Sequence, residues 1–269
     1  MKEDRILKTI PIFQVDAFST QPFSGNPAAV CPVSGFLTDK EMIAIAAENN
    51  LSETAFVDLN TNPFFIRWFT PKLEVNLCGH ATLAAARILF DEYLPVEVDQ
   101  VEFNSRSGRL SAIRDKNLIY LNFPTDEPKK INENILIEQA LGRRPVDLLK
   151  GKDDILAIFD DEAIIKKITP DFEKLMQLES RGLIISSKST SFDFVSRFFA
   201  PQSGINEDPV TGSAHTVLTP YWAKRLGKDK MIGFQCSERG GELQCWLKKD
   251  RVMIGGSTAR YMDGTIRLQ

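Results

Sequence analysis

The sequence is short of the residues that build metal centres and disulfide frameworks. Its 269 residues include only four cysteines and two histidines. The cysteines show no CxxC spacing, and two histidines are too few for a histidine-rich metal centre. No stretch approaches the roughly 20 apolar residues that a membrane span requires, and the N-terminal segment lacks the apolar core of a secretion signal. We therefore expect a cytoplasmic protein with reduced thiols, no metal site and no membrane partner.

Charge of one sign and cofactor-binding motifs are also scarce. The formal net charge is only −3, so no strong positive field attracts nucleic acid. The sequence contains neither a phosphate-binding GxxxxGK(S/T) loop nor a dinucleotide-binding GxGxxG motif, and the zinc-protease motif HExxH is absent as well. These absences disfavour nucleic acid partners and nucleotide or zinc-protease chemistry. We expect no organic cofactor.

The sequence does contain a mixture of β-type segments and apolar helices. Residues 10–18 are rich in β-branched and aromatic residues, which is typical of a strand. Thr38 opens a capping signature that predicts a helix ending near Asn50. Residues 77–90 and 213–226 are largely apolar, and both predict buried helices. The other predicted strands fall within 28–32, 53–59, 64–69, 101–123, 154–159, 182–186, 193–199 and 234–255, and a further helix is predicted at 133–141.

A polar, proline-containing segment near the middle of the chain predicts a domain boundary. It covers Thr125–Lys130, with the sequence TDEPKK, and has the character of a linker. We therefore expect an N-terminal domain over residues 1–124 and a C-terminal domain over residues 125–269. The last strand of the chain is the exception, since it can pack back onto the N-terminal domain.

An internal repeat relates the two halves of the chain. RWFTPK at 67–72 matches RFFAPQ at 197–202, close to half a chain length later. Each segment continues through a polar loop to a glycine that opens an apolar helix, as Gly79-His80-Ala81 in the first half and Gly212-Ser213-Ala214 in the second. Two copies with so long a period favour a duplicated strand–loop–helix unit over a solenoid, which needs at least about three shorter repeats.

The duplication has a functional consequence, because it brings two helix N-termini toward one ligand. Helix N-termini expose unpaired N–H groups and carry partial positive charge. A pair of them forms a site for a carboxylate or an enolate without basic side chains. The expected active site therefore lies in a cleft between the two domains.

Several polar residues near these helices can carry chemistry, and each has a simpler structural explanation. His80 can donate or shuttle a proton, although a lone histidine at a helix N-terminus is often structural. Asp208 can act as an acid or acceptor, or it can cap the following helix. Glu53 precedes an apolar strand, where desolvation would raise the pKa of its carboxyl, or it belongs to a capping turn after Ser52. Cys78 is expected to be a small packing residue, because a two-thiol racemase would need a second cysteine in the matching segment.

The motifs themselves resemble those of a known family. VDAFSTQPFSGNPAAV, NNLSETAFV, RWFTPKLEVNLCGHATLAAARIL and RFFAPQSGINEDPVTGSAH together resemble the PhzF-like phenazine-biosynthesis isomerase family, and they cover both halves of the chain. The resemblance implies an α/β (α+β) fold of two pseudo-symmetric domains, similar to diaminopimelate epimerase. Each domain would be a β-sheet curled around a central helix. The resemblance also implies a homodimer that needs neither a metal nor an organic cofactor.

The resemblance also implies roles for particular residues. Glu53 in the segment NLSETAFV is similar to the family's proton-transfer carboxylate. His80 in CGHAT and Asp208 in EDPVTGSA are similar to its polar partners. Ser213 would donate a hydrogen bond to the substrate.

The same resemblance implies how a substrate carboxylate is held. The backbone N–H groups of Gly79 and Gly212 would bind it. The turn Gly25-Asn26-Pro27 matches the family's GNP motif, and we expect it to shape the cleft without a catalytic role.

The expected function is a cofactor-independent isomerase that moves a proton between carbon atoms of a small carboxylate substrate. Two alternatives remain open at this stage. One is a racemase or epimerase of an amino or hydroxy acid, and the other is a non-catalytic small-molecule binding protein of the same fold.

Overall fold

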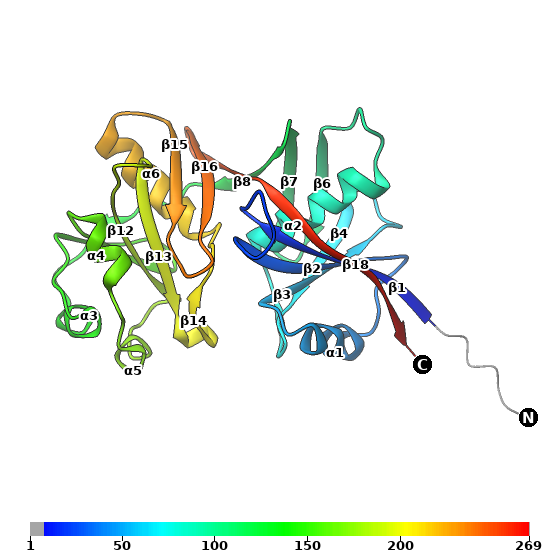
Figure 1. Ribbon diagram of the computed structural model, residues 1–269, viewed down its shortest axis with the longest axis horizontal. Coiled ribbons are helices and arrows are strands. Elements are labelled where there is room, and N and C mark those ends of the chain that lie inside the picture. Colours follow the sequence, from blue (N-terminus) through cyan, green and yellow to red (C-terminus); the bar gives the residue numbers. More distant parts are fainter. Residues whose placement is uncertain (1–7, 269) are drawn as a thin grey trace, which may run out of the picture. The chain divides into compact units, whose positions relative to one another are not determined.

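The computed structural model describes residues 8–268, which form two compact units (Figure 1). The first unit contains Pro27–Leu121 together with residues 8–23 and 257–268. The second unit contains Asn122–Gly256 and the short segment Ser24–Asn26. Within the described residues, no helix is both long and apolar enough to cross a bilayer.

The first unit is a mixed sheet in which the two ends of the described chain pair with each other. β1 pairs with β18 in antiparallel register, from Lys8 opposite Leu268 to Ala17 opposite Thr258. β2 and β3 are parallel, β3 and β4 are antiparallel, β4 and β6 are parallel, and β6, β7 and β8 form an antiparallel meander. The strands are β1 (Lys8–Ala17), β2 (Asn26–Val33), β3 (Glu53–Asp58), β4 (Phe64–Phe69), β5 (Glu74–Val75), β6 (Gln100–Ser105), β7 (Gly108–Asp115), β8 (Leu118–Pro124) and β18 (Thr258–Leu268).

The second unit repeats this connectivity. β11 and β12 are parallel, β12 and β13 are antiparallel, β13 and β15 are parallel, and β15, β16 and β17 form an antiparallel meander. The repeat found in the sequence is therefore a repeat of strand order and direction. The strands are β9 (Lys129–Lys130), β10 (Asp147–Lys150), β11 (Asp154–Ile158), β12 (Gly182–Lys188), β13 (Phe194–Ala200), β14 (Ile205–Asp208), β15 (Lys230–Gln235), β16 (Gly241–Lys248) and β17 (Arg251–Gly256).

Each unit contains one helix that is buried on nearly every side. α2 (Gly79–Ile88) contacts β1, β3 and β18, and it continues into a π-helical turn at Leu89–Tyr93. α6 (Ala214–Leu226) contacts β11, β15, β16 and β17. Both segments are apolar with few charges, so each can be surrounded by a curled sheet. The predicted fold class is confirmed, because each unit is a mixed sheet around a central helix.

The other helices pack on the sheets from outside. α1 (Asp39–Asn49) packs on β3 and β4, and it begins with the capping box predicted at Thr38, whose side chain accepts a hydrogen bond from the Glu41 backbone. In the second unit α3 (Ile135–Leu141), α4 (Glu162–Lys167) and α5 (Phe172–Leu175) contribute to one apolar cluster with β11, β12 and β13.

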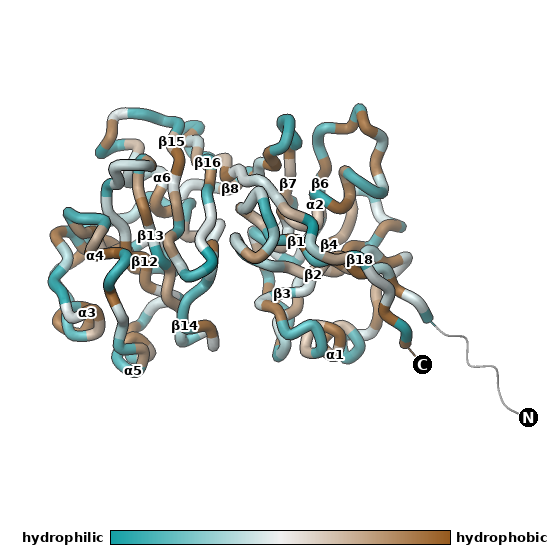
Figure 2. The backbone as a smooth tube through the Cα atoms, viewed as in Figure 1, coloured by the Kyte–Doolittle hydropathy of each residue, from teal (hydrophilic) through white to brown (hydrophobic). Residues whose placement is uncertain are grey.

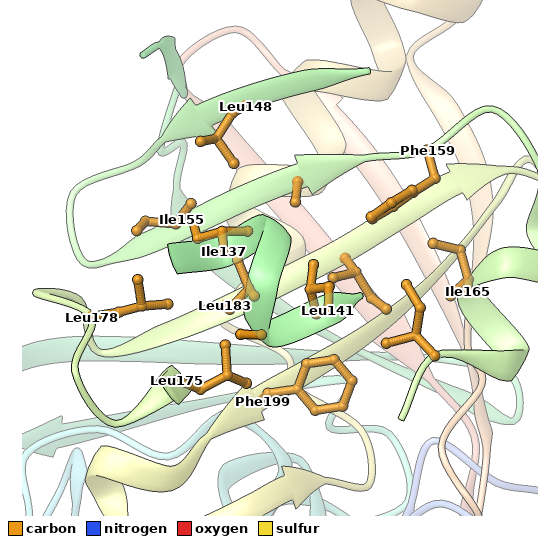
Figure 3. Close-up of a cluster of buried hydrophobic side chains, with 14 of the residues drawn as sticks. Ile137, Leu141, Leu148, Ile155, Phe159, Ile165, Leu175, Leu178, Leu183 and Phe199 are labelled. Carbon is orange, nitrogen blue, oxygen red and sulfur yellow. The ribbon is translucent and has the colours of Figure 1, made fainter. Parts of the chain in front are cut away.

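That cluster shows how the second unit is held together. Figure 3 shows Ile137 and Leu141 of α3 among side chains from the neighbouring strands, including Leu183 and Phe199. Phe199 is fully buried. Figure 2 shows hydrophobic residues along strands such as β12 and β13 and hydrophilic residues at many turns. The hydrophobic effect therefore fixes the strands that carry the polar residues described next.

Candidate functional site

The first unit brings the Glu53 carboxylate to the His80 imidazole. Glu53 is the first residue of β3, and His80 is the second residue of α2. The Glu53 Oε2 atom lies 3.4 Å from His80 Nε2, and the two side chains are only 14% and 7% exposed. Two of the predicted site residues therefore lie side by side and are largely buried.

Burial determines the charge of His80. It lowers the pKa of the imidazole to about 3, because the charged form loses its hydration. His80 is therefore neutral at physiological pH. A neutral imidazole carries one proton, and the neighbouring carboxylate favours the tautomer with that proton on Nε2. In that tautomer Nδ1 is an acceptor.

Cys78 completes the surroundings of His80. It is the N-cap residue of α2, and its side chain makes no capping hydrogen bond to the helix. Its Sγ atom lies 3.5 Å from His80 Nδ1. Cys78 is buried as expected of a packing residue, and it also contacts the candidate site. The N-terminus of α2, which starts at Gly79, has no side-chain cap at Cys78, so it retains the partial positive charge that favours an anion.

The second unit surrounds the Asp208 carboxylate with hydrogen-bond donors. Asn26 Nδ2 donates to Asp208 Oδ1 at 2.8 Å, and Thr211 Oγ1 donates to Asp208 Oδ2 at 2.5 Å. Gln235 Nε2 donates to the Asp208 backbone carbonyl at 2.7 Å. Asp208 therefore belongs to a side-chain network, and the alternative that it caps α6 is wrong.

Burial also shifts the titration of Asp208. It raises the pKa of the Asp208 carboxyl to about 6, although the hydrogen bonds from Thr211 and Asn26 and the charge of Arg181 act in the opposite direction. The carboxyl therefore exchanges a proton close to neutral pH. This property suits a general acid or base.

Ser213 is oriented by an arginine that the sequence analysis did not single out. Arg181 Nη1 donates to Ser213 Oγ at 3.0 Å, and Arg181 also forms an ion pair with the buried carboxylate of Asp154. A guanidinium has only donors, so the Ser213 oxygen must accept from it. The Ser213 proton is then directed elsewhere. Ser213 is the N-cap residue of α6 and makes no side-chain capping bond.

The two central helices begin with the glycine of the repeat at different positions relative to the N-cap residue. Gly79 follows Cys78 at the start of α2, and Gly212 precedes Ser213 at the start of α6. Neither N-cap side chain bonds its helix. Each unit therefore has a central helix whose N-terminus lacks a side-chain cap, and carboxylate binding there stays a prediction.

The repeat also places matching ion pairs. Arg67 on β4 pairs with Glu74 on β5, and Arg197 on β13 pairs with Glu207 on β14. Each guanidinium also lies over the phenylalanine two residues later, at 5.0 Å in the first unit and 4.9 Å in the second. Glu207, the neighbour of Asp208 in the chain, is thus held by Arg197. Two equivalent pairs indicate a structural role in holding the loop before each central helix.

The predicted residues fall into two groups, one in each unit. Glu53, His80 and Gly79 belong to the first unit, whereas Asp208, Gly212 and Ser213 belong to the second. Sequence reasoning missed Asn26 as a partner of Asp208 and Arg181 as a partner of Ser213. The first contact joins residues 182 positions apart, so no local pattern contains it. The GNP motif drew attention to Asn26 without revealing this contact.

Comparisons with known proteins identify the family. The family model for PhzC-PhzF, described as phenazine biosynthesis-like protein, matches residues 15–264. An uncharacterized isomerase of Pseudomonas aeruginosa is 49% identical over 95% of this chain and 97% of its own length. A crystal structure of a PhzF-family phenazine biosynthesis protein from Enterococcus faecalis has a TM-score of 0.94 and 43% identity, covering 97% of this chain and all of that chain.

A more distant structure shares the fold alone. It is a predicted epimerase from Pseudomonas aeruginosa, with a TM-score of 0.76 and 17% identity over 96% of this chain and 99% of that chain. The resemblance seen in the sequence motifs is thus confirmed over nearly the whole chain. The chain belongs to the PhzC-PhzF family of phenazine biosynthesis-like proteins.

Proposed function

We propose that this protein is a metal- and cofactor-independent isomerase that moves a proton between two carbon atoms of a small carboxylate substrate. The observation that carries the proposal is the Glu53–His80 pair. A buried, neutral histidine beside Glu53 can donate a hydrogen bond to the carboxylate without neutralising its charge. Glu53 is then the group that takes the proton from carbon and returns it. The Glu53 Oε2 and His80 Nε2 atoms are 3.4 Å apart, and long hydrogen-bond distances of this kind in an empty active site often shorten when a substrate binds.

The second unit supplies binding groups in this proposal. The uncapped N-terminus of α6 and the Ser213 hydroxyl, oriented by Arg181, would hold the substrate carboxylate. Asp208 would accept or donate a hydrogen bond at a polar group of the substrate. We propose that both groups of residues act on the same substrate molecule. Membership in a family whose curated relative is named an isomerase supports this assignment.

One observation favours epimerisation as a second candidate. The Asp208 carboxyl, with a pKa of about 6, is a second group able to exchange protons near neutral pH. An epimerase needs one group to remove a proton and another to return it on the opposite face of the carbon. In that case Asp208→Asn would abolish turnover as completely as a change at Glu53, whereas the isomerase proposal expects a partial loss.

Deuterium exchange tests the proposal. The purified protein would be incubated in D₂O with a panel of small carboxylates that includes dihydro-hydroxyanthranilate, and label incorporation would be followed by NMR. The matched variants are Glu53→Gln and Glu48→Gln, since Glu48 is an exposed glutamate on α1. We expect exchange in the wild type and in Glu48→Gln and its loss in Glu53→Gln. Exchange of equal rate in Glu53→Gln would refute the proposal, and the labelled carbon separates isomerisation from epimerisation.

A further inference from the structure

The cluster around His80 contains three different metal-ligating groups. The carboxylate of Glu53, the thiol of Cys78 and the imidazole of His80 each place one ligand atom within 4.8 Å of the others. Among residues 8–268, no other set of three such side chains meets this condition. Sulfur, nitrogen and oxygen in this combination are the ligands that zinc uses in proteins, and three protein ligands leave a fourth position open.

The distances between the ligand atoms suit a tetrahedral ion. Zinc bonds of about 2.3 Å to sulfur and about 2.0 Å to nitrogen, at a tetrahedral angle, separate the two ligand atoms by about 3.5 Å. Cys78 Sγ lies 3.5 Å from His80 Nδ1. The Glu53 Oε2 atom lies 3.4 Å from Nε2, the other ring nitrogen of His80, and the three ligand atoms lie within 4.8 Å of one another. The Glu53 carboxylate therefore has to rotate toward Nδ1 to join an ion held there. Only one nitrogen of His80 binds the ion.

The burial of these side chains limits the access of water to the ligand atoms. Cys78 and His80 are 7% and 6% exposed, so an ion there would be largely removed from competing water. The matching position in the second unit offers no equivalent site, because Thr211 and Ser213 stand where Cys78 and His80 stand in the repeat. Hydroxyl groups are poor ligands for zinc in comparison with a thiolate and an imidazole.

We propose that Glu53, Cys78 and His80 form a binding site for one Zn²⁺ ion, and that this ion inhibits the enzyme. The inhibitory part rests on the proposed function of Glu53. When the carboxylate oxygen donates its lone pair to the metal, it is not available to accept a proton from carbon. Binding forms a bond from zinc to the Cys78 sulfur and releases the thiol proton to solvent.

Cobalt spectroscopy tests the metal site without any substrate. The protein, freed of metal by dialysis against EDTA, would be titrated with Co²⁺, which reports thiolate ligation by a charge-transfer absorption in the near ultraviolet. Zinc affinity would be measured by calorimetry. The variants are Cys78→Ser and the control Cys236→Ser, whose thiol is partly buried and lies outside the proposed site.

We expect one metal ion per chain and a thiolate absorption in the wild type and in Cys236→Ser. Cys78→Ser should lose the absorption and bind zinc at least about tenfold more weakly, since a lost ligand costs at least as much as the second-shell changes that cost about 10–100-fold. A thiolate absorption that persists in Cys78→Ser, or its absence from the wild type, would overturn the site.

The inhibitory part has a separate readout. Each protein would be assayed for deuterium exchange before and after equimolar Zn²⁺ and compared with its own metal-free rate. We expect zinc to suppress deuterium exchange in the wild type and EDTA to restore it. Zinc should change the exchange rate of Cys78→Ser only slightly. Exchange that is unaffected by bound zinc, or that requires zinc, contradicts the inhibition. If the cobalt absorption appears while no Glu53-dependent exchange is found, the metal site stands and the proposed function fails.

Discussion

Removal of the Arg181 guanidinium should destabilise the second unit in a pH-dependent manner. Arg181 Nε donates to Asp154 Oδ1 at 2.9 Å, and Asp154 is only 2% exposed whereas the arginine side chain is 41% exposed. Arg181→Ala would leave a buried carboxylate without its cation. Loss of one partner from such a pair costs about 3–5 kcal/mol, and we expect the lower end because Arg181 is partly solvated.

The sign of the pH dependence follows from Asp154. Burial raises the pKa of its carboxyl in the folded protein, and Arg181 opposes that rise. Without Arg181 the pKa rises further. When the pKa of a carboxyl is higher in the folded protein than in the unfolded chain, the free energy of unfolding falls as the pH rises. This fall takes place between the pKa of the unfolded chain and the pKa of the folded protein. The loss in Arg181→Ala should therefore be largest at about pH 8 and smaller at about pH 4.5, where the carboxyl can be protonated.

Urea unfolding at the two pH values measures this effect. Trp222 and Trp246 lie in the second unit and Trp68 lies in the first, so tryptophan fluorescence reports mainly on the second unit. Arg144→Ala is the matched control, because Arg144 pairs with Glu133 where both side chains are exposed, and we expect it to cost less than about 1 kcal/mol. Asp154→Asn in the Arg181→Ala background should recover much of the loss. An Arg181→Ala cost no greater than that of the control, or equal at both pH values, would refute the reasoning.

Three further predictions concern other parts of the molecule. The pKa of Asp208 in the folded protein is about 6 and lies above the ordinary value of 3.8. The free energy of unfolding of Asp208→Asn should therefore increase relative to that of the wild type between about pH 4 and pH 7. A difference between the two proteins that is constant over this pH range in urea unfolding would contradict this prediction. Thr38→Ala removes the capping box of α1 and should cost about 1 kcal/mol, whereas an unchanged unfolding free energy would argue against the cap. Leu83→Ala in α2, where the side chain is fully buried, should cost about 2–5 kcal/mol, and a cost below about 1 kcal/mol would show that α2 is not central to its unit.

The features that could be predicted from the sequence are those that depend on residues close together in the chain or on a repeated segment. The capping box at Thr38 needs only residues three positions apart, and the buried helix α2 follows from its apolar composition. The duplication was visible because Arg67 and Arg197 stand in matching segments. That same repeat held a signal that was not used, since Glu74 and Glu207 follow the two arginines and pair with them in the same manner.

The features that sequence could not predict depend on contacts between distant segments. Asn26 contacts Asp208 because the segment Ser24–Asn26 packs with the second unit, whereas its neighbours in the sequence belong to the first unit. Arg181 belongs to none of the recognised motifs. It precedes β12 directly, and it contacts Ser213 at the N-terminus of α6. The neutral state of His80 also depends on burial by the completed unit. Tertiary packing therefore decides the orientation and charge of residues whose identity the sequence already suggested.

The central claim is that Glu53 carries the proton between carbon atoms. Its most direct test is the initial rate of carbon-bound deuterium incorporation by Glu53→Gln, measured on a carboxylate that the wild-type protein labels. Because the amide retains the shape of the carboxyl and cannot accept the proton, the account predicts a rate lower by at least about 10²–10⁴-fold. A rate within about tenfold of the wild type, in a variant with an unchanged circular dichroism spectrum, would contradict the assignment of Glu53.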